Sequence, residues 1–266
     1  MKIIELHNRL YTVPESWNEL TGRQLLQVME VLYGDMPVNT ARLKLLKILT
    51  GITWYRFFLV PLRERAEFLY LTDFLINDIG LTKQLLPEYR GFYGPDDDFN
   101  NITGEEYVFS EDYYFKAFTK EGPDEPKVLN EEMLNELVAV LYRRKKKGYD
   151  LTLNKDGDPR EVFNQNICHY HAKNTISKWP LAARLAVFTW YENCRQNMIN
   201  SNPDIFKGGN GEPAKYGLIS VMRVIAEGGI HGTFEHVQKM YVKMWMVELN
   251  EKYEEAKRNE ENSKLS

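Results

Sequence analysis

The sequence has little cysteine and no long hydrophobic run. Only two of the 266 residues are cysteine, Cys168 and Cys194, and they do not form a Cys-x-x-Cys pair. Zinc-ribbon and thioredoxin-type sites therefore lack their ligand spacing, and two buried thiols are expected. No window approaches the roughly 20 apolar residues that span a bilayer, and the first residues are not typical of a signal peptide. We expect a cytoplasmic protein without membrane contact.

A surplus of positive charge is also missing. The chain carries 34 Lys and Arg against 38 Asp and Glu, a net charge of −4. Because phosphate contacts supply most of the affinity for nucleic acid, this balance disfavours a nucleic-acid-binding protein. One local basic cluster, Arg143–Lys147, has Tyr142 and Tyr149 as neighbours that could stack on bases. The alternative, which we favour, is a solvated helix end whose cations complement the helix dipole.

Catalytic motifs are absent. The sequence has no Gly-x-Ser-x-Gly elbow, no phosphate-binding Gly-x-x-x-x-Gly-Lys loop and no Gly-x-Gly-x-x-Gly after a strand. Neither cysteine has the context of a nucleophile. We therefore predict a protein that is not an enzyme, with no catalytic residue and no cofactor.

Three segments resemble metal sites, and each has a plainer interpretation. His169 and His171 are two apart in a predicted helix, where they point about 200° away from each other and cannot bind one ion. Asp96–Asp98 is interpreted as an exposed acidic turn. Residues 154–158 resemble the start of a calcium loop, but Pro159 and Gln165 occupy the positions that require Gly and Glu. We predict no metal site.

Signals of helix formation dominate the rest of the chain. Thr21 and Gln24 form a capping-box pair, Thr103 and Asn130 are further N-caps, and Gly51 is a helix stop. With 43% hydrophobic residues the chain can bury a large core. We predict an all-α fold, a multi-helical bundle of about nine or ten helices. The main ones are expected near residues 23–33, 40–49, 61–74, 103–118, 130–142, 159–171, 181–198, 214–226 and 233–255.

The helices are expected to form two packed lobes or, alternatively, one domain. Residues 86–101 are rich in turn formers and are interpreted as an ordered loop. The lobes would comprise residues 1–120 and 121–266 and meet near residues 119–130. The second would end in a charged helical tail that has no apolar face to dock. Gly208–Gly211 is a candidate hinge.

A cluster of large apolar residues in the last predicted helix is the best candidate for a binding surface. Met240, Met244, Trp245 and Met246 fall on more than one side of that helix. Such a helix is either central to a core or contacts a partner. The core interpretation is the simpler one, but methionine-rich surfaces also adapt to varied apolar helices. We therefore predict these four residues as a candidate partner-binding site.

Several segments together resemble uncharacterised helical proteins of tailed bacteriophages and prophages of gut Bacteroidetes. The segments are Trp17–Thr21, Gly94–Asp96, Asn101–Tyr107, Leu137–Arg143 and Asp158–Phe163, and the likeness extends over most of the chain. These phage proteins are expected to be encoded among the tail genes, near the tape-measure protein. The resemblance carries no functional residue over to this chain.

The resemblance implies a tail assembly chaperone in the host cytoplasm. Such a protein would bind apolar helical segments of the tape-measure protein until tail tube subunits assemble around it. This chain is longer than typical chaperones of that class. The alternative is a structural virion component, such as a tail-completion or connector subunit. A second copy of the chain is a further candidate partner, and a nucleic-acid-binding regulator that uses Arg143–Lys147 is a third hypothesis.

Overall fold

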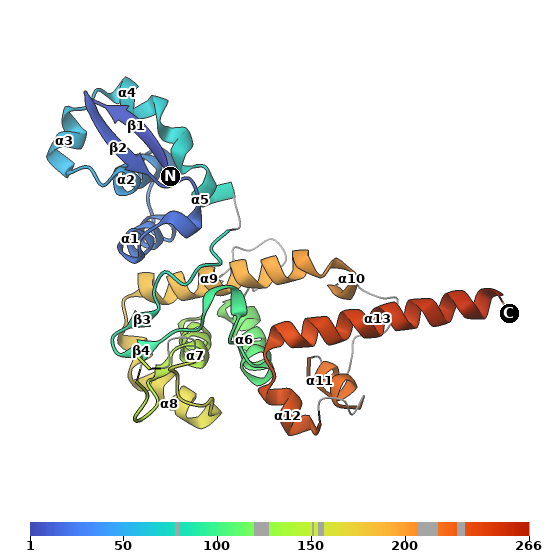
Figure 1. The fold of residues 1–266 in the computed structure, drawn as a ribbon. Coiled ribbons are helices and arrows are strands. Elements are labelled where there is room, and N and C mark those ends of the chain that lie inside the picture. The colour runs from blue at the N-terminus through green and yellow to red at the C-terminus, as the bar shows by residue number, and fades with distance from the viewer. Residues whose placement is uncertain are drawn as a thin grey trace. The chain divides into compact units, whose positions relative to one another are not determined.

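The protein is mostly helical, with a few short antiparallel strand pairs (Figure 1). A computed structural model describes residues 1–77, 80–119, 128–150, 152–153, 157–206, 218–227 and 232–265. Over these ranges there are thirteen α-helices rather than the nine or ten expected, and seven short strands that the helical patterns did not predict. The helical class is confirmed in this coarser sense.

The described chain divides into two compact units. Unit 1 comprises Met1–Leu86 and Lys178–Cys194, and unit 2 comprises Pro87–Ser177 and Arg195–Ser266. This division differs from the expected lobes, because α9 (Leu181–Ser201) returns to the N-terminal elements and gives most of its length to unit 1. The predicted boundary at residues 120–121, the candidate hinge at Gly208–Gly211 and most of the calcium-like segment 154–158 lie outside the described residues.

Unit 1 opens with a β-hairpin that the sequence analysis missed. Strands β1 (Lys2–Leu6) and β2 (Arg9–Val13) pair antiparallel, and His7 and Asn8 form the turn with φ of 49° and 58°. Positive φ at both turn residues matches the twist of a two-residue hairpin. Ile4 and Leu6 point inward and are buried, as the period of two in a strand requires.

Helices complete unit 1 around the hairpin and α9. Their caps follow the predicted chemistry: the Gln24 N–H donates to Thr21 Oγ1 (3.2 Å) at the start of α1, and Gly51 ends α2 with a φ of 64°. The helix expected over 61–74 is instead interrupted by a 3-10 helix, Leu69–Thr72. The α-helices are α1 (Gly22–Leu32), α2 (Val38–Thr50), α3 (Trp54–Leu59), α4 (Leu62–Glu67) and α5 (Phe74–Asn77).

In unit 2, α6 (Gly104–Ala117), α7 (Glu131–Leu141) and α8 (Gln165–Asn174) pack in sequence, α6 on α7 and α7 on α8. The predicted caps are confirmed, since Thr103 accepts from the Glu106 N–H and Asn130 from the Met133 N–H. The strands are β3 (Glu88–Tyr89), β4 (Phe92–Tyr93) and β7 (Arg143–Arg144) in one sheet, with β5 (Phe118–Thr119) and β6 (Val128–Leu129) in another.

The start of α8 corrects a prediction. We expected Asp158 and Pro159 to begin a helix, but α8 begins at Gln165 with Asn164 as its N-cap. Asp158 instead accepts hydrogen bonds from the backbone and the guanidinium of Arg160, at 2.8–3.1 Å. This local turn competes with helix formation, because it occupies the carboxylate that a cap requires.

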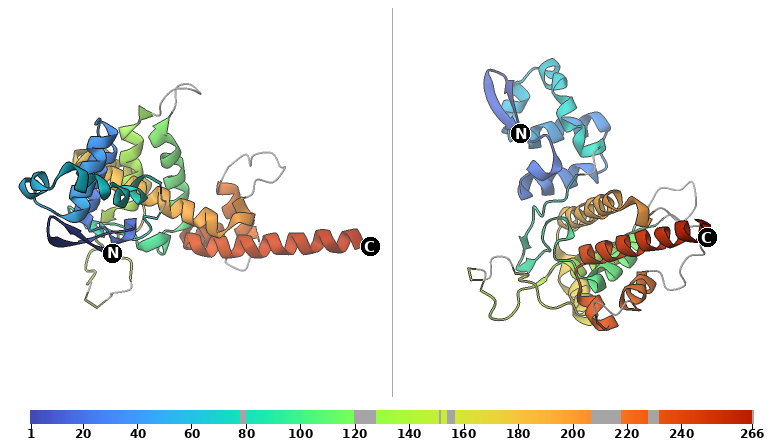
Figure 2. Two further views of the ribbon diagram at one scale, coloured as in Figure 1. Left: turned by 90° about the horizontal axis from the view of Figure 1, so that it is seen from above. Right: turned by 45° about the vertical axis from the view of Figure 1, so that its right-hand side comes forward.

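The last predicted helix is broken into two. α12 (Phe234–Lys239) ends at Met240, and α13 (Val242–Leu265) follows, next to α10 (Pro203–Phe206) and α11 (Leu218–Glu227). The segment that leads into α6 pairs with the chain at this break: the Gly104 N–H donates to the Met240 carbonyl (2.8 Å) and the Val242 N–H to the Ile102 carbonyl (2.8 Å). The C-terminal part of α13 extends past the other elements of unit 2, as both further views show (Figure 2).

Candidate protein-binding site

Of the four apolar residues predicted as a binding surface, two are buried and two are accessible. Trp245 is fully buried and Met246 is 7% exposed, whereas Met244 is 47% exposed and Met240 is half-buried. The Trp245 indole N–H donates to the Val237 carbonyl (3.0 Å), and its ring lies against Gly104. Trp245 and Met246 therefore belong to the core of unit 2.

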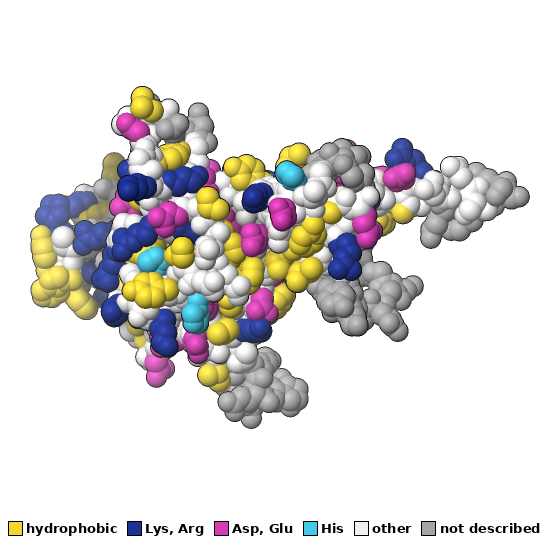
Figure 3. All heavy atoms as spheres, turned by 90° about the horizontal axis from the view of Figure 1, so that it is seen from below, with side chains coloured by type: hydrophobic (Ala, Val, Ile, Leu, Met, Phe, Trp, Pro, Cys, Tyr) yellow, Lys and Arg dark blue, Asp and Glu magenta, His cyan; other side chains and the backbone are white. Residues whose placement is uncertain are grey.

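The basic cluster is not a solvated helix end. α7 ends at Leu141, and Arg143 lies in β7 with its side chain buried. Its guanidinium binds Glu106 Oε1 (2.6 Å) and the Val140 carbonyl (2.7 Å). Arg144 lies over the Phe92 ring (4.1 Å), and the cluster therefore offers fewer free cations than its sequence suggests. On the face in Figure 3, basic side chains are mixed with acidic and hydrophobic ones.

Arg143 belongs to a buried charge cluster that the sequence analysis did not find. Arg160 has no exposed surface, and it lies 3.3 Å from Glu106 and 2.8 Å from Asp158. Burial opposes the charge of Asp158, but the hydrogen bonds and charge of Arg160 outweigh it and lower the pKa of that carboxyl. These charges neutralise one another inside unit 2, which suits a structural role.

The candidate metal ligands have other partners. His169 and His171 lie on α8, which confirms the predicted helix, and His169 Nδ1 lies 2.5 Å from Glu136 Oε1. Asp98 forms an ion pair with Lys243 (2.7 Å). Over the described ranges, no three His, Cys, Asp or Glu side chains are placed to hold one ion.

An exposed apolar surface of unit 1 lies on α3 and at the first residue of α4. Four large apolar side chains are about two-thirds exposed: Trp54 (66%), Phe58 (68%), Leu59 (65%) and Leu62 (62%). Large apolar side chains that are exposed together commonly mark a contact surface. We call these four residues the α3 ridge.

Local sequence explains why α3 presents these side chains outward. Phe57 is 4% exposed and Val60 is buried, so they anchor the helix to unit 1. Trp54 and Phe58 are four residues apart and therefore lie on one face, where their rings pack edge to face at 6.1 Å. Pro61 follows the C-cap Val60 and ends the helix.

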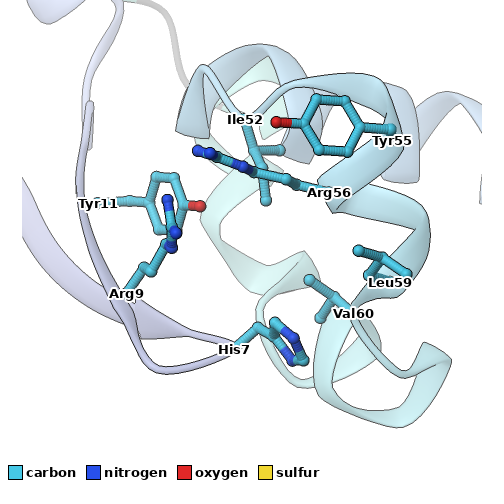
Figure 4. Close-up of a pocket in the computed structure, with 8 residues that line it drawn as sticks. All are labelled: His7, Arg9, Tyr11, Ile52, Tyr55, Arg56, Leu59 and Val60. Atoms are coloured by element: carbon cyan, nitrogen blue, oxygen red, sulfur yellow. The ribbon is translucent and has the colours of Figure 1, made fainter.

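A hollow of about 250 Å³ borders the α3 ridge (Figure 4). The buried side chains of Ile52 and Val60 line it together with Leu59. Figure 4 shows Arg56 extending from α3 toward the strand that carries Arg9 and Tyr11. His7 and Tyr55 complete the lining.

The charge of this hollow is one-sided. Its lining contains two arginines and a histidine but no carboxylate. Among the described residues, no Asp or Glu forms an ion pair with Arg9 or Arg56, and Arg56 lies 5.5 Å from the Tyr55 ring. The nearby Glu64 accepts the backbone N–H of His7 (2.6 Å). The α3 ridge and the hollow together offer apolar, aromatic and cationic groups, which suit recognition of a partner.

The sequence contains a signal for this site that we did not use. Residues 54–62 read Trp-Tyr-Arg-Phe-Phe-Leu-Val-Pro-Leu, and such an apolar run is ordinarily a core segment. A six-residue helix can bury only one of its faces, so the remaining aromatic side chains had to be exposed or covered by a partner.

A second hollow of about 280 Å³ lies within unit 2 and includes one predicted residue. Met246 lines it with Phe99 and Met198, and Lys243 and Asp98 lie at the same hollow. Lys243 and Asp98 pair with each other, so the charge of each is already compensated in this hollow. The α3 ridge is therefore the better candidate for an apolar contact surface.

None of the described helices combines the length and hydropathy that crossing a bilayer requires. No family model matches the chain, and comparisons with curated proteins and with solved structures find no similar protein.

Proposed function

We propose that the protein is a non-enzymatic binding protein of phage tail assembly, which holds apolar helical segments of a tape-measure-like partner in the host cytoplasm. The α3 ridge supports the binding part of this proposal. Four apolar side chains, each about two-thirds exposed, are unfavourable in water and become favourable when a partner covers them. The phage part rests on the sequence resemblance.

The composition of the α3 ridge fits a protein partner. Trp, Tyr, Phe and Arg are enriched in the central parts of protein interfaces, and Trp54, Tyr55, Arg56 and Phe58 are adjacent here. Helices bind in such places by laying an apolar face against exposed side chains. The partner-binding role is therefore proposed for the α3 ridge, with Met240 and Met244 of unit 2 as a further apolar surface.

The test is co-expression with the tape-measure protein encoded beside this chain. The wild-type protein should keep that partner soluble, and the double variant Trp54→Ser, Phe58→Ser should not. Val162→Ser removes an apolar side chain that is 77% exposed in unit 2, and it is the matched control. Equal solubility of the partner with and without the wild-type protein would refute the proposal.

Mass spectrometry of purified particles distinguishes the alternative, a structural virion component. A chaperone leaves the tail before it is complete and should be absent from the particles. Stoichiometric presence would support the structural virion component instead.

A further inference from the structure

The α3 ridge offers a row of exposed apolar side chains, and the neighbouring hollow offers a recess that one side chain can enter. The ridge presents Trp54 and Phe58 four residues apart, and its Leu59 is four residues from Tyr55, which lines the hollow. Such rows fit into the grooves of another helix. The hollow next to them has a buried apolar lining, Ile52 and Val60.

The hollow has room for one large apolar side chain. An apolar cavity of about 150 Å³ accommodates benzene, and this one measures about 250 Å³. A phenylalanine or leucine from a partner therefore fits, with its backbone outside beside the α3 ridge.

The rim of the hollow carries two exposed cations. Arg9 from β2 and Arg56 from α3 line the same hollow, and like charges that approach each other are unfavourable without a counter-charge. No described carboxylate forms an ion pair with either guanidinium. A carboxylate from a partner would bind there with charge-assisted hydrogen bonds.

We propose that this site binds an amphipathic helix whose apolar face is bordered by Glu or Asp, with one apolar side chain in the hollow and a carboxylate at Arg9 and Arg56. The inference rests on the proposed function and names the chemistry of the partner segment. A polynucleotide would satisfy the arginines but would leave most of the α3 ridge uncovered, and the net charge of −4 opposes it.

The experiment uses the full chain and two synthetic helices of about 20 residues. Both helices carry Leu and Phe at helical spacing, and their flanking positions are Glu in one and Gln in the other. Fluorescence anisotropy should show about tenfold tighter binding of the Glu helix, a preference that falls as salt rises. The double variant Arg9→Gln, Arg56→Gln should remove this preference and bind both helices like the Gln helix.

Arg63→Gln is the matched control. Arg63 is 94% exposed on α4, outside the hollow, and its only described ion pair is with Glu67 at 3.7 Å. It should leave the preference unchanged. Thermal unfolding of each variant checks that the fold is retained.

The outcomes separate this inference from the proposed function. Equal binding of both helices, with both weakened by Phe58→Ser, would keep the binding function and overturn the charge selection. Binding of neither helix would overturn both. Tighter binding of a 20-nucleotide single-stranded RNA, lost in the arginine variant, would overturn the protein partner. A concentration-dependent dimer in light scattering that Phe58→Ser abolishes would instead assign the site to a second copy of the chain.

Discussion

Two neighbouring phenylalanines should respond oppositely to the same substitution. Phe57 is 4% exposed and Phe58 is 68% exposed, although both belong to α3. Phe57→Ala removes a core side chain and leaves a cavity, which typically costs about 3–5 kcal/mol of stability. That is a large share of the roughly 5–15 kcal/mol that holds a typical domain together. Phe58→Ala should change the free energy of unfolding by about 0.5 kcal/mol or less.

Phe58→Ala should weaken binding of a partner although it hardly changes stability. Complete burial of a phenylalanine stabilises by about 1.5–3 kcal/mol, and Phe58 still has about two-thirds of its surface to bury. Covering it would therefore contribute about 1–2 kcal/mol, so Phe58→Ala should weaken binding of the Glu helix about five- to thirtyfold. Urea denaturation measures the first quantity and fluorescence anisotropy the second.

The result that refutes this reasoning is specific. A loss of more than about 2 kcal/mol of stability in Phe58→Ala would mean that the protein itself packs against this side chain. Unchanged binding would mean that the α3 ridge is not the contact. The unfolding data must be fitted without assuming a single transition, because two units need not unfold together.

Three further predictions concern unit 2. Glu106→Gln should destabilise it by about 3–5 kcal/mol in urea denaturation, because it leaves Arg160 without part of its buried counter-charge. Gly104→Ala should prevent native packing, seen as lost near-ultraviolet circular dichroism, because a Cβ there would lie 1.6 Å from the Trp245 ring. Stability should fall as the pH drops below about 4. Because the pKa of Asp158 is lowered in the folded protein, its contribution to the free energy of unfolding is complete above the ordinary pKa of an aspartate and is lost as the pH falls through the lowered pKa.

Matched controls exist for each of the three. Asp112→Asn breaks an exposed ion pair with Lys116 and should cost at most about 0.5 kcal/mol. Gly80→Ala meets its nearest non-neighbouring heavy atom only at 3.9 Å and should fold normally. Asp158→Asn should reduce the loss of stability at acid pH. If this variant loses as much stability as the wild type, other carboxyls cause the loss.

Local chemistry was predictable at several helix ends. The Thr21, Thr103 and Asn130 caps and the Gly51 stop lie where their sequence patterns place them. Each of these interactions spans only a few residues, so no distant segment is needed to form it.

A long-range contact accounts for one failure. The continuous apolar pattern across residues 233–255 favours one helix, but hydrogen bonds with residues 102 and 104 accompany its break at Met240. The hairpin was missed because its turn, His7–Asn8, lacks the glycine that usually marks such turns. The alternation of Ile4 and Leu6 was the available signal.

The same reasoning explains why Trp245, predicted at a binding surface, is buried. Trp54 and Trp245 both lie in short apolar stretches, and composition alone cannot distinguish them. Trp245 becomes core because Gly104, 141 positions earlier, leaves room for its ring, and the Val237 carbonyl accepts its indole N–H. Trp54 has no such arrangement: its ring packs edge to face with Phe58, itself two-thirds exposed. Exposure of an aromatic side chain is thus decided by whether the fold supplies a complementary surface, and at the α3 ridge the described residues leave Trp54 and Phe58 about two-thirds exposed.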